Sequence, residues 1–196
     1  VNDCVYGFSL KAFNISGFQG QLTGGGARPN LFQVTIDNPV DRGSFIKTSF
    51  MVQAAQIPEA TLGVATVNYF GRQIKYAGNR TFADWTVTVV NDEDFLVRDG
   101  MERWSNAING LQTNTRSTAL AQAAQYKSNA TVTQFAKTGE PIRTYNFVGL
   151  FPLTVGAIAL DWGTNDAVET FDVTFSYDFW QAGQGVVGQV TAPLFG

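Results

Sequence analysis

The stretch from Thr81 to Gly110 constrains the fold most, because a strand pattern in it runs directly into a helix pattern. Residues 82–90 are mostly large apolar and β-branched side chains, which favour a strand. Trp85, Val87 and Val89 fall on one face of that strand, since side chains alternate between the two faces. We therefore expect the other strands of the chain to cover this strand and the helix after it.

The helix pattern begins after the polar run Asn91 to Asp94 and ends at Gly110, a natural helix terminator. Asp92 or Asp94 can accept hydrogen bonds from the first free backbone amides, and their charge suits the positive end of the helix dipole. Four apolar side chains at spacings of four, three and four form one stripe: Val97, Met101, Trp104 and Ile108. The sequence predicts a helix over about residues 95–109 that buries this stripe.

Several further segments have the alternating or β-branched pattern of short strands. They are Leu31–Asp37, a hairpin of Asn129–Lys137 with Ile142–Leu150, a short strand Ile158–Trp162, and Val168–Trp180. Phe151 and Pro152 are expected to end the second arm of that hairpin. Many short strands with one helix predict a mainly β fold, a sandwich or barrel of two packed antiparallel sheets with one flanking α-helix.

The chain of 196 residues is long enough for one sizeable core, and nothing in its composition calls for a second. We predict a Gly-rich arm over residues 1–29, a β domain over residues 30–180 and a tail over residues 181–196. No apolar run reaches the ~18 residues of a membrane span, so none is expected. The first residues lack the pattern of a signal peptide, and we expect synthesis in the cytoplasm.

Two segments, Gly43–Ile57 and Leu62–Ala77, are expected to be extended, with a tight turn near Gly71, but their patterning is poor. Neither face is strongly apolar, which suits strands that pair with another chain or line a wet surface. A plain solvent-exposed hairpin is the alternative. The candidate residues of this surface alternate along both segments: Phe50, Val52, Ala54, Val64, Thr66, Asn68, Gln73 and Lys75.

The composition excludes several kinds of chemistry. There is no histidine, which removes histidine-dependent catalytic triads and histidine metal sites. Cys4 is the single cysteine, so neither an internal disulfide nor a cysteine-rich zinc site can form. A formal charge of -3 argues against a protein that grips nucleic acid through its phosphates, although DNA can still pass it without capture. We expect no cofactor and no metal.

Two alternative sites involve acidic side chains. The run Asn91 to Asp94 has calcium-binding side chains, but its spacing is not that of an EF-hand, and helix capping explains it. A pair among Asp161, Asp172 and Asp178 would be the acid and base of a glycoside hydrolase.

Exposed aromatic side chains offer a further alternative, a monomeric carbohydrate-binding sandwich. Tyr69, Tyr76 and Trp162 are the candidates for stacking on sugar rings. Core or subunit contact is the more common use of such residues.

Six segments, in this order, resemble the tail tube protein of contractile-tailed bacteriophages. They are ARPNLFQVTI from Ala27, AGNRTFADWTVTVVNDED from Ala77, YKSNATVTQ from Tyr126, GLFPLTVG from Gly149, LDW from Leu160 and ETFDVTFSYDFW from Glu169. The resemblance covers about Ala27 to Trp180. It does not extend to the Gly-rich arm, to the segment Gly43–Gly63 or to the tail.

The resemblance implies a structural virion protein, not an enzyme, related to the tube protein of type VI secretion. Six-membered rings of such a protein stack helically into a hollow tube inside a contractile sheath. The implied partners are further copies of the chain, the sheath protein, a baseplate initiator, a tail terminator, and a tape-measure protein and DNA in the lumen without tight binding. Assembly is expected in the host cytoplasm. Another ring-forming tail, baseplate or secretion-tube protein is the alternative.

The resemblance also assigns a place to the two poorly patterned segments. It implies that they pair across subunits to line the lumen of the tube.

Overall fold

The computed structural model describes residues 15–183, so residues 1–14 of the predicted arm and residues 184–196 of the predicted tail lie outside the described residues. The described part of the arm contains a short helix, α1 (Ile15–Gln21), and a 3-10 turn, η1 (Thr23–Gly25). At the other boundary, strand β9 continues past Trp180 to Gly183.

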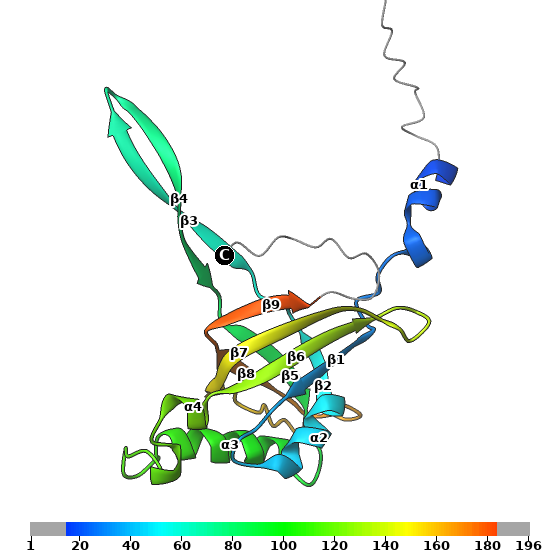
Figure 1. Cartoon of the computed structure of the whole chain (residues 1–196). Helices are drawn as coiled ribbons and strands as arrows, with labels where there is room; N and C mark the ends of the chain where they lie inside the picture. The colour runs from blue at the N-terminus through cyan, green and yellow to red at the C-terminus, as the bar shows by residue number, and fades with distance from the viewer. Residues whose placement is uncertain (1–14, 184–196) are drawn as a thin grey trace, which may run out of the picture.

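Seven strands form one continuous antiparallel sheet, and two further strands form a separate hairpin (Figure 1). The sheet has the order β1-β6-β7-β8-β5-β2, with β9 also paired to β7. Its strands are β1 (Phe32–Ile36), β2 (Val52–Ala55), β5 (Trp85–Val90), β6 (Ser128–Phe135), β7 (Pro141–Val155), β8 (Thr170–Ser176) and β9 (Phe179–Gly183). The hairpin consists of β3 (Ala60–Tyr69) and β4 (Arg72–Phe82). The predicted mainly β class is confirmed.

The sheet folds into two layers because β7 changes partner halfway along its length. It pairs with β9 up to Val148 and with β6 up to Leu150, and from Phe151 onward it pairs with β8. The strand therefore does not end at Phe151, as predicted, but continues to Val155. One layer is β1-β6-β7-β9, and the other is β2-β5-β8 with the second half of β7.

Gly149 forms the corner at which β7 passes between the layers. Its φ is 73°, which favours glycine, and a Cβ built on it would lie 2.2 Å from Asp178 Oδ2. The Asp178 amide donates to the Val148 carbonyl at 3.0 Å. The predicted strand 168–180 is accordingly broken at residues 177–178 into β8 and β9, each in a different layer.

The core lies between the two layers. Trp85 of β5 stacks on Phe147 of β7, with ring centroids 4.4 Å apart and planes 11° apart. The Trp85 indole N–H donates to the Gln56 carbonyl at 2.7 Å, so its one polar group is satisfied. Trp85, Val87 and Val89 are all buried, which confirms the predicted inner face of this strand.

The predicted helix is α3 (Leu96–Ile108), and it covers one end of the sandwich (Figure 1). Val97, Met101 and Trp104 of its stripe are buried and Ile108 is half-buried against the core, as predicted. The Leu96 amide donates to Asp94 Oδ1 at 3.1 Å, so Asp94 does satisfy an amide of the first turn. The polar connection after α3 contains η2 (Thr118–Leu120) and α4 (Ala123–Tyr126), where Trp104 Nε1 donates to the Tyr126 carbonyl at 2.9 Å.

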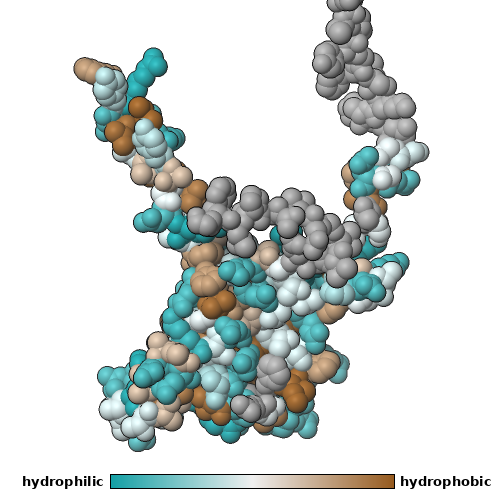
Figure 2. Space-filling view, in the orientation of Figure 1, coloured by the Kyte–Doolittle hydropathy of each residue, from teal (hydrophilic) through white to brown (hydrophobic). Residues whose placement is uncertain are grey.

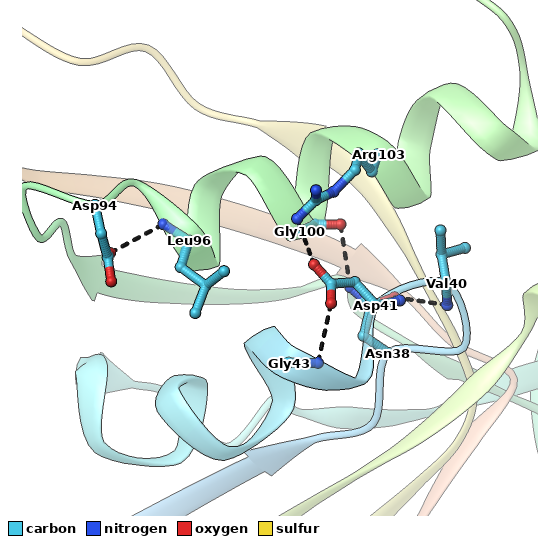
Figure 3. A network of polar contacts seen from close by, with 8 residues as sticks. All are labelled: Asn38, Val40, Asp41, Gly43, Asp94, Leu96, Gly100 and Arg103. Carbon is cyan, nitrogen blue, oxygen red and sulfur yellow. Dashed lines mark hydrogen bonds and ion pairs between the residues drawn. The ribbon is translucent and has the colours of Figure 1, made fainter.

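The prediction of an extended segment over Gly43–Ile57 is wrong, because α2 (Arg42–Met51) occupies most of it. Asp41 caps this helix by accepting the Gly43 amide at 2.9 Å. Asn38 donates to the Gly100 carbonyl of α3 at 3.1 Å, and Asp41 forms an ion pair with Arg103 (Figure 3). These polar contacts attach the start of α2 to α3, so α2 is a second helix beside the predicted one.

The predicted strand Ile158–Trp162 is also wrong, since residues 156–169 contain no strand. This segment connects β7 to β8 and is tied down at both ends. Arg98 Nη1 donates to the Gly156 carbonyl at 3.1 Å, and the Asn91 amide nitrogen donates to the Glu169 carbonyl at 2.8 Å.

The corner at Gly149 gives a first test. We expect Gly149→Ala to lower the free energy of unfolding in urea by about 2–4 kcal/mol, from backbone strain and the clash with Asp178. Gly139→Ala is the matched control, because Gly139 also has a positive φ of 87° but has open space around a Cβ. The control should cost about 1–2 kcal/mol. Equal losses for the two variants would contradict the role of the corner.

Lys47 of α2 gives a pH test. It bonds to Asp92 at 2.7 Å and also to Asp94. These hydrogen bonds raise the pKa of Lys47 above 10.5, and the bond from Lys47 lowers the pKa of both carboxyls below 3.8. The ion pairs therefore stabilise the folded chain at every pH between the carboxyl pKa values and the lysine pKa. This stabilisation is lost as pH falls through the lowered carboxyl pKa values or rises through the raised lysine value.

We accordingly expect Lys47→Met to be less stable than the unaltered chain at neutral pH, by thermal unfolding. The difference should close on acidification well below 3.8, where both carboxyls are protonated in either protein. A difference that persists in acid would show that the lysine stem, and not the ion pair, stabilises α2.

Candidate assembly surface

The β3–β4 hairpin extends away from the sandwich and is hydrogen-bonded to no other strand of residues 15–183 (Figure 1). Its base is held by the Ala83 amide, which donates to the Glu59 carbonyl at 3.4 Å, and by the Tyr177 hydroxyl, which donates to the Ala83 carbonyl at 2.7 Å. Beyond this base, nearly every side chain is exposed.

The tip of the hairpin is a two-residue turn, Phe70-Gly71. Both residues have positive φ, 43° and 78°, as in the type I′ turn that matches the twist of the flanking strands. Phe70 is an uncommon residue at such a φ. Its ring is exposed and packs edge-on against Tyr69 with centroids 4.5 Å apart. The predicted tight turn near Gly71 is confirmed.

A bulge divides the hairpin near its middle. The register shifts between Leu62 and Val64, where Gly63 lies opposite Gly78 and its neighbour. A Cβ built on Gly78 would lie 3.0 Å from the Gly63 carbonyl carbon, so the two backbones approach closely here. Bulges increase the local twist of a strand pair and change the direction of the strands beyond them. The strands in the outer half of the hairpin therefore run in a different direction from those at its base.

The outer half has two different faces, because directly paired residues share a face. One face carries the pairs Val64↔Ala77, Thr66↔Lys75 and Asn68↔Gln73. The other carries Ala65↔Tyr76, Val67↔Ile74 and Tyr69↔Arg72. We call the first the polar face and the second the apolar face.

The structure brings together five of the eight predicted surface residues and separates the other three. Val64, Thr66, Asn68, Gln73 and Lys75 all lie on the polar face. Phe50 instead lies on α2, while Val52 and Ala54 lie on β2 and pair with β5 in the main sheet. These three therefore do not belong to the hairpin, and the predicted grouping of all eight is wrong.

The apolar face was missed from the sequence, although its residues alternate as regularly as those of the polar face. Four large side chains on it are 44 to 64% exposed: Val67, Tyr69, Ile74 and Tyr76. Figure 2 shows hydrophobic and hydrophilic residues side by side along the hairpin where it projects from the body. An apolar surface of this kind, with the open edges of both strands beside it, is typical of an interaction site.

The hairpin is also basic, in a chain whose formal charge is -3. Residues 60–82 include Arg72, Lys75 and Arg80 and no acidic residue. A two-stranded hairpin is marginal in water on its own, and this one has no covering layer within the described residues. The arrangement therefore fits a segment that becomes buried against an apolar and acidic surface.

The segment 156–169, between β7 and β8, presents a second exposed apolar surface. Leu160, Trp162 and Val168 on it are highly exposed, and Trp162 is fully so. We call this segment the 156–169 loop.

The acidic residues suggested as a glycoside hydrolase pair are not assembled into a site. Asp172 accepts the Thr88 hydroxyl at 2.7 Å, Asp178 pairs with Lys127 at 2.6 Å, and Asp161 accepts the Gly163 amide at 2.9 Å. Asp172 lies in β8, Asp178 lies between β8 and β9, and Asp161 lies in the 156–169 loop.

The metal and sugar alternatives gain no support from the geometry. Within residues 15–183 no group of three acidic, histidine or cysteine side chains is placed to hold a metal. Tyr69 and Tyr76 lie on the hairpin and Trp162 on the 156–169 loop, so they form no common stacking platform. None of the helices between residues 15 and 183 is long and apolar enough to cross a membrane.

Comparison with known proteins gives consistent matches over almost the whole described chain. A model of the phage tail tube protein family matches residues 22–183. The tail tube protein gp19 of Enterobacteria phage T4 is 35% identical over 158 residues, covering 79% of this chain and 91% of that protein. The tail tube protein of Serratia phage KSP90 is 24% identical over 168 residues, covering 83% and 93%.

Solved structures with the same fold come from contractile injection systems. The extended sheath-tube complex of the extracellular contractile injection system PVC gives a TM-score of 0.57 at 16% identity, covering 88% of this chain and 98% of that one. The tube-terminating cap of the anti-feeding prophage gives 0.59 at 16% identity, covering 81% and 91%. At this identity the likeness shows the fold alone.

Proposed function

The chain belongs to the phage tail tube protein family, and we propose that six copies form a ring and that rings stack helically into the inner tube of a contractile tail. Its relatives are structural proteins of the virion and not enzymes. The observation that carries the proposal is the β3–β4 hairpin, which exposes an apolar face and two open strand edges in the single chain.

The hairpin supports contact between subunits better than a position on the lumen. Val67, Ile74 and Tyr76 would remain in water on a lumen wall, whereas a neighbouring copy would bury them. The hairpin also carries three basic residues, which would attract the phosphates of a passing genome. We therefore assign it to an interface between copies.

The outer face of the layer β1-β6-β7-β9 is the better candidate for the lumen wall. Most side chains paired across it are polar and uncharged, with Val148 and Phe179 as an apolar pair at one end. The polar ones are Gln33, Thr35, Thr131, Thr133, Thr144, Asn146 and Gln181. Such a surface offers DNA no cation to hold its phosphates. Within the described residues, β1 and β9 are the two free edges of this layer, and neighbouring copies can extend the sheet through them.

In such a tail the tube also contacts several other components. A sheath protein surrounds the tube, a baseplate component initiates it, and a terminator ends it. The lumen holds a tape-measure protein and then the genome, neither bound tightly. Assembly takes place in the host cytoplasm. Another ring-forming tail or baseplate protein is the second candidate, and it differs in forming a single ring where the tube protein forms a polymer.

Assembly of the purified chain on matching baseplates tests the proposal. We expect hollow tubes by negative-stain electron microscopy, and single subunits by mass photometry after Val67→Asp with Ile74→Asp. These two residues are paired on the apolar face, and burying them contributes about 1.5–3 kcal/mol each, so assembly should fall by tenfold or more.

The pair Asn68→Asp with Gln73→Asp is the matched control. It makes the same charge change at the adjacent pair on the polar face, and tubes should still form. Failure of the unaltered chain to polymerise on a baseplate would overturn the tube function. Normal tubes from the apolar-face variant would overturn the role of the hairpin.

A further inference from the structure

We infer that the apolar face of the hairpin docks on the 156–169 loop of a second copy, stacked head to tail along the tube. The inference rests on the proposed tube function and names the receiving surface, which lies on a different part of the fold from the hairpin.

The hairpin and the 156–169 loop lie at opposite ends of the same two strands. The hairpin enters β5 at Trp85, which pairs with Phe175 of β8. The loop enters β8 at Thr170, which pairs with Val90 at the other end of β5. The six residues of β5 separate the two surfaces by about 17 Å, so they cannot meet within one chain but can meet between stacked chains.

The loop is built as a fixed apolar projection. The Thr164 amide donates to the Asp161 carbonyl at 3.2 Å, which closes a tight turn around Trp162. Glu169 at the loop end accepts the side-chain amide of Asn91. An exposed tryptophan on a held turn is the type of residue that dominates binding energy in protein interfaces.

The charges of the two surfaces are complementary. The 156–169 loop contains Asp161, Asp166 and Glu169 and no basic residue. The hairpin contains three basic residues and no acidic one, and one of the three, Arg72, lies on the apolar face itself. Contact between them brings opposite charges together around an apolar centre, which favours this pairing over others and speeds encounter.

Charge also argues against the simplest alternative, two hairpins pairing with each other. That contact would place Arg72, Lys75 and Arg80 of both copies together, and it would stop at a dimer by symmetry. Contact of one surface with a different surface on the next copy does not stop at a dimer, and when its rotation does not close into a ring it continues as an open helical stack.

Disulfide trapping in assembled tubes tests the contact, in a chain with Cys4→Ser. We expect Val67→Cys combined with Gly163→Cys, which keeps Trp162, to give a ladder of covalent multimers on non-reducing gels after mild oxidation of tubes. A Cβ at Gly163 meets only ordinary contacts. Asn68→Cys combined with Gly163→Cys is the control, since Asn68 is adjacent to Val67 in sequence but lies on the polar face. An equal ladder from the control, or tubes that form without any ladder from the first pair, would overturn the contact.

Trp162→Ala separates this contact from a contact with the sheath. Trp162 is fully exposed, so the variant should melt at an unchanged temperature, while tube assembly on baseplates falls about tenfold or more. Normal tubes that fail to acquire a sheath would assign the loop to the sheath and overturn the inference, with the tube function intact. An unaltered chain that forms no tubes on baseplates would overturn both.

Discussion

The two layers of the sandwich are joined by a single strand that belongs to both, and the fold depends on how that strand turns. β7 passes from one layer to the other at Gly149, where a positive φ favours glycine and the Asp178 side chain lies against the position that a Cβ would occupy. Because of this turn, Phe147 on one layer meets Trp85 on the other in a near-parallel stack. The interruption of the strand pattern at residues 177–178, between β8 and β9, lies beside the same corner.

The body and the hairpin differ in how far their apolar side chains are buried and their backbone groups are paired within the chain. In the body, both buried tryptophans donate to backbone carbonyls, and α3 covers the open end with a buried stripe. In the hairpin, paired strands expose apolar side chains on one face and unpaired backbone on both edges. The body thus has a closed core, although the buried Trp180 Nε1 has no hydrogen-bond partner among the described residues. The hairpin has no covering layer there, and a neighbouring copy can supply one.

Local sequence patterns predicted those elements in which the spacing of apolar residues matches the buried face in the structure. The alternation around Trp85 and the spacing from Val97 to Ile108 correspond to buried faces, so β5 and α3 were predicted correctly. Helix α2 was missed because Ile46 and Phe50 are exposed and no apolar stripe marks it, although Asp41 supplies a capping signal. The corner of β7 could not be predicted, because it depends on which strands pair with it across the chain.

The hairpin shows the same limit of local patterns for the candidate site. Alternation placed Val64, Thr66 and Asn68 together on one face, but only the strand pairing reveals that Val67 and Ile74 form an apolar pair opposite them. A high-resolution cryo-electron microscopy map of the assembled tube tests the proposed role of this pair most directly. We predict that Val67 and Ile74 lie within about 4 Å of side chains from another copy. A map in which this face is open to the lumen or to solvent would contradict that role.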